Sequence, residues 1–171
     1  VGLAADGGFA KYCVLDGDLV HVIPDSLSYE QAALTEPAAV AVYAVRQSAL
    51  KAGDTAAVFG LGPIGLLIVE ALRAAGASKI YAVELSPERQ AKAEELGAIV
   101  VRPEEGETAV EAIHRLTNGG VDVSYEVTGV PVVLGQALAA VHKAGECMVV
   151  SIWEREANIN PNEFAIQEKT L

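Results

Sequence analysis

The sequence is short of cysteine, of basic residues and of long hydrophobic runs, and each shortage excludes a class of protein. Two cysteines in 171 residues cannot build a disulfide framework. Twelve Lys and Arg against 23 Asp and Glu give a net charge of −11 without any basic cluster, which excludes binding to a nucleic acid backbone. No apolar run is long enough and free enough of charge to span a bilayer, and no signal peptide is visible, although the chain starts at Val1. We therefore expect a protein of the reducing cytoplasm that binds neither nucleic acid nor membrane.

Aromatic residues are also few, at 5%, while hydrophobic residues make up 51% of the chain. Alanine, valine, leucine and glycine dominate, which is typical of helices packed on both faces of a parallel sheet. We therefore expect one well-buried domain with some extra structure. Cys13 and Cys147 lie in strand-like apolar runs, and we expect both to be small buried hydrophobic residues.

Strands and helices are predicted to alternate regularly from residue 55 onward. Short glycine-containing breaks separate the elements, and this spacing specifies a parallel sheet with helices on both faces. The ligand should then lie at the carboxyl ends of the strands. The predicted strands are near 55–59, 79–83, 99–101, 121–125 and 145–150, and the predicted helices are near 63–75, 87–96, 107–117 and 131–142.

The first 30 residues have a different, loop-rich and β-like pattern. Gly8–Val14 and Leu19–Ile23 are predicted strands that cannot bury themselves alone, so we expect residues 1–30 to be the remnant of another sheet. Ser28 and Gln31 predict a capping box, and a second helix is expected from about Thr35 to Ala49. Near the other end, residues 164–166 are expected to begin a strand.

The most informative motif is Gly60-Leu61-Gly62-Pro63-Ile64-Gly65, a Gly-x-Gly-x-x-Gly loop between a strand and a helix. Gly60 permits the tight turn, Gly62 lets a pyrophosphate approach the backbone, and Gly65 lets the helix pack closely on the strand. The free N–H groups at the start of that helix bind phosphates. The motif predicts a dinucleotide site in an α/β, Rossmann-type doubly wound sheet over residues 31–171.

Glu84 ends the next predicted strand, roughly 24 residues after Gly60. A carboxylate there accepts hydrogen bonds from the adenosine ribose and repels the 2′-phosphate of NADP, so NAD is the expected cofactor. Arg89 lies one turn into the next helix and could bind a phosphate or flank the ribose.

Glu36 has two interpretations from the residues alone. It could be a first-turn acid that favours the helix dipole, or a metal ligand, for which no Cys or His is placed to help. His21 falls in a predicted strand, and His114 and His142 fall on predicted helices. No nucleophile–base arrangement is apparent, so the chain reads as a cofactor-binding half without a complete catalytic set.

Nearly the whole chain resembles the zinc-dependent medium-chain alcohol dehydrogenases, and within them the sorbitol and butanediol dehydrogenase branch. The segments that carry this resemblance are Gly7–Tyr12, Leu34–Ala41, Phe59–Leu66, Val121–Gly129, Val150–Glu154, Asn160–Asn162 and Glu168–Leu171. The resemblance implies hydride transfer between a secondary alcohol or diol and NAD, with zinc polarising the oxygen.

The resemblance also implies roles for individual residues. Glu36 would be the third ligand of a catalytic zinc, and Val40 would lie against the nicotinamide. Ile64 would contact the pyrophosphate and ribose, and Glu84 and Arg89 would flank the adenosine ribose. Thr128 and Val130 would line the adenosine side, while Val150, Ser151 and Ile152 would bind the carboxamide. Trp153 is expected close to the nicotinamide.

The family's other zinc ligands would lie upstream of this sequence, and its last strand beyond Leu171. We therefore expect a fragment that binds dinucleotide without turning over alcohols. Homo-oligomerisation through the dinucleotide-binding domain stays open. The two alternative functions are an S-adenosylmethionine-dependent methyltransferase, which the third glycine disfavours, and a free-standing dinucleotide-binding or assembly module without catalysis.

Overall fold

The computed structural model describes residue 2 and residues 5–171, which fall into two compact units, Val1–Thr35 and Glu36–Leu171. The first unit contains a short 3-10 helix, η1 (Gly17–Leu19), and helix α1 (Tyr29–Ala32). Ser28 caps α1 through the predicted capping box, in which Gln31 N donates to Ser28 Oγ at 3.2 Å and Ser28 N donates to Gln31 Oε1 at 3.0 Å.

The strands predicted at Gly8–Val14 and Leu19–Ile23 are wrong, because the described part of the first unit contains no strand. An extended segment becomes a strand only when a neighbour satisfies its N–H and C=O groups, and none of the described residues supplies that neighbour. Most side chains in this unit are exposed, and Cys13 is exposed rather than buried as we expected.

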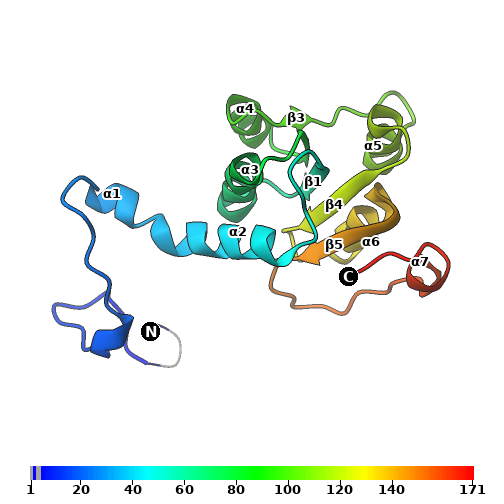
Figure 1. The fold of residues 1–171 in the computed structure, drawn as a ribbon. Coiled ribbons are helices and arrows are strands. Elements are labelled where there is room, and N and C mark those ends of the chain that lie inside the picture. The colour runs from blue at the N-terminus through cyan, green and yellow to red at the C-terminus, as the bar shows by residue number, and fades with distance from the viewer. Residues whose placement is uncertain (1, 3–4) are drawn as a thin grey trace. The chain divides into compact units, whose positions relative to one another are not determined.

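The second unit contains a five-stranded, all-parallel sheet (Figure 1). Its strands lie in the order β3-β2-β1-β4-β5, and the register pairs Phe59 of β1 with Val83 of β2 and with Glu126 of β4. The order of the chain therefore reverses between β1 and β4, where open α/β sheets form a ligand crevice. The strands are β1 (Thr55–Phe59), β2 (Lys79–Val83), β3 (Ile99–Val100), β4 (Val121–Glu126) and β5 (Val141–Val149).

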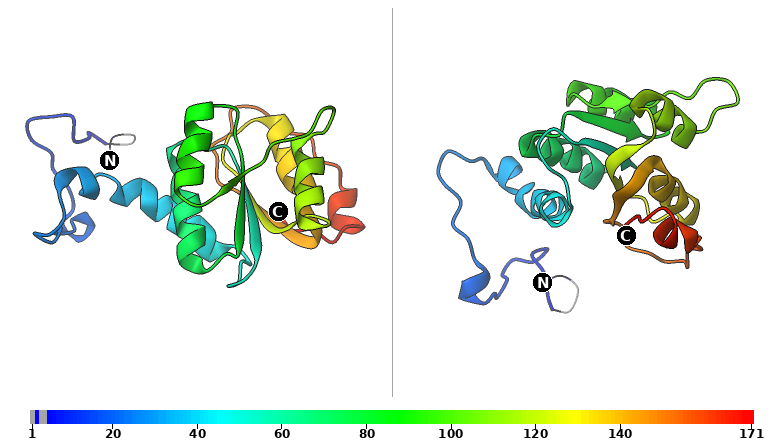
Figure 2. Two further views of the ribbon diagram at one scale, coloured as in Figure 1. Left: turned by 90° about the horizontal axis from the view of Figure 1, so that it is seen from above. Right: turned by 45° about the vertical axis from the view of Figure 1, so that its right-hand side comes forward.

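Helices cover both faces of this sheet, as Figure 2 shows, and this confirms the predicted doubly wound α/β fold. One hydrophobic cluster joins the sheet to α2, α3 and α4, and a second joins it to α5 and α6. Because β1 is covered on both faces, its sequence after Thr55 is wholly apolar. The helices are α2 (Thr35–Gln47), α3 (Pro63–Ala75), α4 (Pro87–Glu95), α5 (Ala109–Thr117), α6 (Pro131–Ala140) and α7 (Asn162–Ala165).

Two predictions near the carboxyl end of the chain are wrong. Helix α6 ends at Ala140 and β5 starts directly at Val141, so His142 lies in a strand rather than on a helix. Residues 162–165 form the short helix α7 where we expected a strand to begin. After α7 the chain returns to the edge of β5, where Thr170 forms a parallel bridge with Glu146. Cys147 is buried in β5 as predicted.

Of the helices in the described part of the chain, none combines the length and the apolar character needed to cross a bilayer.

Candidate functional site

The glycine loop between β1 and α3 is so tightly packed that two of its glycines cannot carry a side chain. Gly60 has φ of +95°, and a Cβ there would lie 2.5 Å from Thr128 Cγ2. A Cβ on Gly65 would lie 2.0 Å from the carbonyl oxygen of Gly60. Gly62 differs, because a Cβ there would meet nothing within 4 Å. The loop is therefore closed on its inner side and open at Gly62, where a ligand can approach the backbone.

Helix α3 starts directly at this open position. Gly62 is its N-cap residue without a side-chain cap, and Pro63 occupies the first helical position. The first-turn N–H groups have no acceptor within the helix, and the helix dipole adds positive charge to them. Ile64 is partly buried and packs against the core on this face, so it anchors the first turn. The start of α3 thus presents backbone donors suited to phosphate oxygens.

Glu84 lies at the end of β2 and ties the glycine loop to it. Leu61 N donates to Glu84 Oε2 at 2.9 Å, and Leu85 N and Ser86 N donate to Oε1 at 2.7 and 3.0 Å. Arg89 Nη1 lies 3.5 Å from Oε2. Burial acts to raise the pKa of Glu84, but the three backbone donors and Arg89 outweigh it, and the pKa lies below its usual value. Glu84 is therefore ionised at neutral pH and carries a negative charge beside the glycine loop.

A pocket of about 580 Å³ opens beside this carboxylate, and we call it the glycine-loop pocket. It brings together six of the residues predicted for the cofactor site. These are Gly60, Gly62, Glu84, Arg89, Thr128 and Val130. Val83, Val127, Val132 and Val133 add apolar walls, which suit the flat face of an adenine ring.

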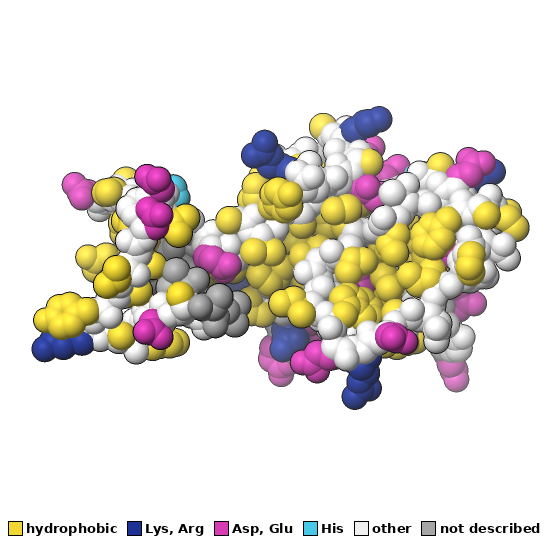
Figure 3. Space-filling view, turned by 90° about the horizontal axis from the view of Figure 1, so that it is seen from below, with side chains coloured by type: hydrophobic (Ala, Val, Ile, Leu, Met, Phe, Trp, Pro, Cys, Tyr) yellow, Lys and Arg dark blue, Asp and Glu magenta, His cyan; other side chains and the backbone are white. Residues whose placement is uncertain are grey.

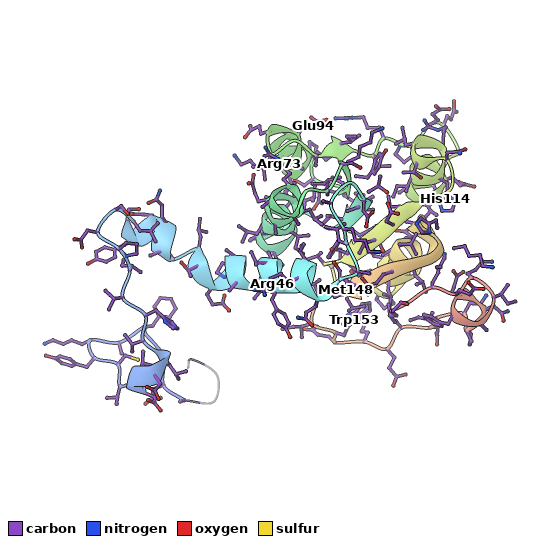
Figure 4. The ribbon with its side chains drawn as sticks, in the orientation of Figure 1. Arg46, Arg73, Glu94, His114, Met148 and Trp153 are labelled. Atoms are coloured by element: carbon purple, nitrogen blue, oxygen red, sulfur yellow. The ribbon has the colours of Figure 1, made fainter. Side chains whose placement is uncertain are left out.

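A second pocket of about 600 Å³ lies between α2 and β5, and we call it the α2–β5 pocket. It contains the predicted residues Glu36, Val40 and Val150, together with Tyr43 and Met148. Figure 4 shows Met148 on β5 close to α2. Apolar side chains cover much of one face of the second unit (Figure 3). Val40, Tyr43 and Val149, which line the α2–β5 pocket, are among the exposed large hydrophobic residues of the chain.

The structure brings Glu36 together with no other metal ligand. Its side chain is exposed in the first turn of α2, and no group of three His, Cys, Asp or Glu side chains capable of holding a metal occurs within residue 2 and residues 5–171. The described residues therefore do not form a zinc site on their own.

Ser151 and Ile152 line neither of these two pockets. Ile152 is 93% exposed and borders a separate recess together with Thr128, Val130 and Arg155. Trp153 packs against the hydrophobic cluster around α6, on the segment after β5 and away from α3 and α4 (Figure 4). The ring lines none of the pockets described here, and its expected position beside a nicotinamide stays a prediction.

Sequence reasoning missed Glu126, the last residue of β4, whose side chain is completely buried. Its Oε1 accepts from Thr128 N at 2.7 Å and from Gly129 N at 3.1 Å, and the Thr128 hydroxyl also donates to it. Its Oε2 accepts from the Ser151 hydroxyl. From sequence alone, an acidic residue at the end of a strand is expected to be solvated. The only signal for burial is the set of hydrogen-bond donors that follow it in the sequence, Thr128, Gly129 and Ser151.

Further polar contacts join the elements that carry the site without lining its two pockets. The Tyr125 hydroxyl lies 2.7 Å from Ser48 Oγ, which joins β4 to the residue after α2, and burial raises the pKa of Tyr125 to about 12. At the opposite end of β4, Asp122 accepts from Thr55 N at 2.7 Å and contacts His142 Nε2 at 3.1 Å. His114 Nε2 on α5 lies 2.9 Å from the carbonyl oxygen of Ala139.

Comparison with protein families matches residues 63–171 to the zinc-binding dehydrogenase family. The chain is 62% identical, over its whole length, to (R,R)-butanediol dehydrogenase of Bacillus subtilis, of which it covers 50%. It is 41% identical to sorbitol dehydrogenase of the same organism, over 86% of the chain and 42% of that relative. The chain thus spans about half the length of the relatives that it matches.

Solved structures agree. The crystal structure of 2R,3R-butanediol dehydrogenase from B. subtilis matches 86% of this chain with a TM-score of 0.82 and 66% identity, over 43% of that chain. A zinc-binding dehydrogenase of Sinorhizobium meliloti bound to NADP matches 99% of this chain with a TM-score of 0.92 and 31% identity, over 51% of that chain.

Proposed function

Because this chain belongs to the zinc-binding dehydrogenase family, we propose that it is the NAD-binding half of a zinc-dependent alcohol dehydrogenase of the butanediol or polyol type. The observation that carries the proposal is the glycine-loop pocket. There the glycine loop after β1, which is crowded at Gly60 and Gly65 and open at Gly62, meets an ionised carboxylate, Glu84, beside the switch point of the sheet.

The residues present fit a dinucleotide. Gly62 leaves open space for the pyrophosphate, the first turn of α3 offers N–H donors, and Glu84 offers acceptors for the adenosine ribose. Arg89 would flank the same ribose, and Thr128 and Val130 would line the adenosine side. Val40 and Val150 would face the nicotinamide from the α2–β5 pocket. Ser151 and Ile152, which come next in the chain, would bind the carboxamide together with Val150.

Bound NAD would supply the hydride acceptor for oxidation of a secondary alcohol, and the chain's own task is to hold and orient it. Apolar side chains along the α2–β5 pocket would exclude water from the reacting face. Glu84 favours NAD over NADP, since its charge repels a 2′-phosphate. The S. meliloti neighbour is bound to NADP, so this preference needs a direct test.

Glu36 is the only residue of this chain that we propose as a zinc ligand. One exposed carboxylate cannot hold the metal, so Glu36 would serve as a ligand in a longer protein that brings the remaining ligands. We expect the 171-residue chain to bind dinucleotide without alcohol turnover. A vicinal diol or an acetoin-type ketone is the proposed substrate class, supported by the names of the relatives. Homo-oligomerisation through the second unit and a cytoplasmic location stay predictions.

Calorimetric titration of the chain with NADH, and with NADPH in parallel, tests the proposal. Heat is a signal that does not depend on the position of Trp153, whose ring packs against the hydrophobic cluster around α6. Saturable binding of NADH with much weaker binding of NADPH supports an NAD site read by Glu84. Equal binding of both would contradict the role of Glu84, and absence of binding would contradict the proposed function. If the chain binds NADH but its open reading frame encodes no zinc ligands upstream, the alternative is favoured. That alternative is a dinucleotide-binding or assembly module without catalysis.

A further inference from the structure

Glu126 is a buried carboxylate whose surroundings are neutral. Its exposed fraction is 0%, and none of the ion pairs among the described residues includes it. An uncompensated buried charge is costly, so a protein retains one only where hydrogen bonds satisfy it. At Glu126 these donors are two backbone N–H groups and two hydroxyls, and all come from two loops that follow neighbouring strands.

The two loops border the candidate site from different sides. Residues 127–130 follow β4, and Val127, Thr128 and Val130 line the glycine-loop pocket next to Gly60. Residues 150–152 follow β5, and Val150 lines the α2–β5 pocket. The backbone of Glu126 also contacts the second loop, because Val150 N donates to Glu126 O at 2.9 Å, while Val127 N of the first loop donates to Phe59 O of β1 at 3.0 Å. The two loops are in close contact at Gly129, since a Cβ there would lie 2.7 Å from the carbonyl oxygen of Ile152.

We infer that Glu126 is a positioning residue that clamps the loops at 127–130 and 150–152 together and so fixes the separation between the adenosine and nicotinamide sides of the site. This inference rests on the proposed function for its effect on the cofactor, but the clamp itself can be measured without any ligand. Glu126 touches neither pocket, so it acts on the cofactor only through Thr128, Gly129 and Ser151.

The variant Glu126→Gln tests the clamp with little change in side-chain volume. Gly129 N lies 3.1 Å from Oε1 and 3.3 Å from Oε2, so it faces amide hydrogens whichever way the Gln side chain is oriented. Asp122→Asn is the matched control, because Asp122 is the other carboxylate of β4 and its partners, Thr55 and His142, lie at the opposite end of the strand. Ser151→Ala removes one hydroxyl donor and serves if Glu126→Gln does not fold.

Two measurements on the full 171-residue chain decide the inference. Amide hydrogen exchange without ligand should accelerate about tenfold at residues 128–130 and 150–152 in Glu126→Gln, while Asp122→Asn leaves these residues as in the wild type. NADH affinity should fall about tenfold, and 5′-AMP affinity much less, because AMP spans only one side of the clamp. Ser151→Ala should accelerate exchange at 150–152 and weaken NADH without weakening AMP.

Unchanged exchange in both loops overturns the clamp, whatever the cofactor does. Faster exchange with unchanged NADH affinity overturns the positioning role and leaves a contribution to stability alone. Equal losses for NADH and AMP also overturn it, since they would report a general loss of folded protein. If the wild type binds no NADH, the proposed function fails, and the exchange measurement still decides whether Glu126 joins the loops.

Discussion

The peptide N–H of Leu61 donates a hydrogen bond to Glu84 Oε2 at 2.9 Å, so the carboxylate at the end of β2 holds the centre of the glycine loop. Glu84 therefore has two tasks that sequence motifs do not separate. One oxygen fixes the loop to the sheet, and the carboxylate as a whole would set the charge that a bound ribose or 2′-phosphate meets. Substitutions at Glu84 should accordingly affect both the loop and the choice of cofactor.

Replacing Glu84 with Gln removes the charge and keeps one acceptor. We expect NADH affinity to fall about tenfold, since hydrogen bonds to a charged group contribute roughly 1.5–3 kcal/mol, and the preference for NADH over NADPH to shrink. Parallel titrations with both nucleotides measure the change. Glu88→Gln is the control, because Glu88 is an exposed acid on the adjacent helix that binds only Ser86 Oγ, at 2.7 Å. An unchanged NADH to NADPH ratio in Glu84→Gln would count against the charge as the basis of selection.

The sequence predicted best those helices and strands whose ends are marked by clear breaks in the pattern. Strands β1 and β2 and helix α3 were predicted with their observed bounds, because short apolar runs, glycine breaks and Pro63 leave few alternatives. His142 was placed on a helix because α6 and β5 adjoin without a break in an apolar sequence. The strands expected before residue 24 require partners that no pattern in the chain supplies. Glu126 escaped notice because burial is a tertiary property, set by two loops that are far from each other in sequence.

Three glycines should respond to alanine in three different ways. Gly65→Ala places a Cβ 2.0 Å from the Gly60 carbonyl, so it should destabilise the fold by about 1–3 kcal/mol. Gly62→Ala meets open space in a protein without ligand, so it should melt near the wild-type temperature while NADH binding is lost. Gly135→Ala in helix α6 also meets open space and should stabilise by roughly 0.5–1 kcal/mol.

Thermal melting and NADH titration of these variants separate packing from binding. Normal NADH affinity in Gly62→Ala would contradict the approach of the pyrophosphate at this position. Wild-type melting of Gly65→Ala would mean that α3 can move away from the loop without cost.

The contact between His142 and Asp122 predicts a weak dependence of stability on pH. Burial acts to lower the pKa of His142, but the Lys143 carbonyl, Asp122 and the charge of Asp54 outweigh it, and the pKa is raised. Its contribution to stability is therefore fully present below the unfolded pKa of about 6.5 and is lost as pH rises through the higher folded value. The pKa of Asp122 is lowered: burial opposes the shift, and donors from Thr55 and His142 outweigh it. This second contribution is lost as pH falls through the folded value, below about 4.

Denaturant midpoints measured between pH 5 and 8 test the histidine. The wild type should lose less than about 1 kcal/mol across this range, because both side chains are more than a third exposed and solvent screens the pair. His142→Gln should flatten the profile around neutral pH. A wild-type profile that rises with pH in this window would show that the sign is wrong.

The two cysteines should differ sharply in reactivity. Burial raises the pKa of Cys147 to about 11, and the side chain is enclosed in β5, so almost no thiolate is available at pH 8. Cys13 is exposed and should be accessible to a thiol reagent. A chromogenic disulfide reagent should therefore titrate one thiol in the native chain and two in guanidinium. Cys13→Ser should abolish the fast native reaction, whereas Cys147→Ser should leave it intact.

Rapid titration of both thiols without denaturant would mean that β5, the strand on which the α2–β5 pocket depends, opens readily to solvent.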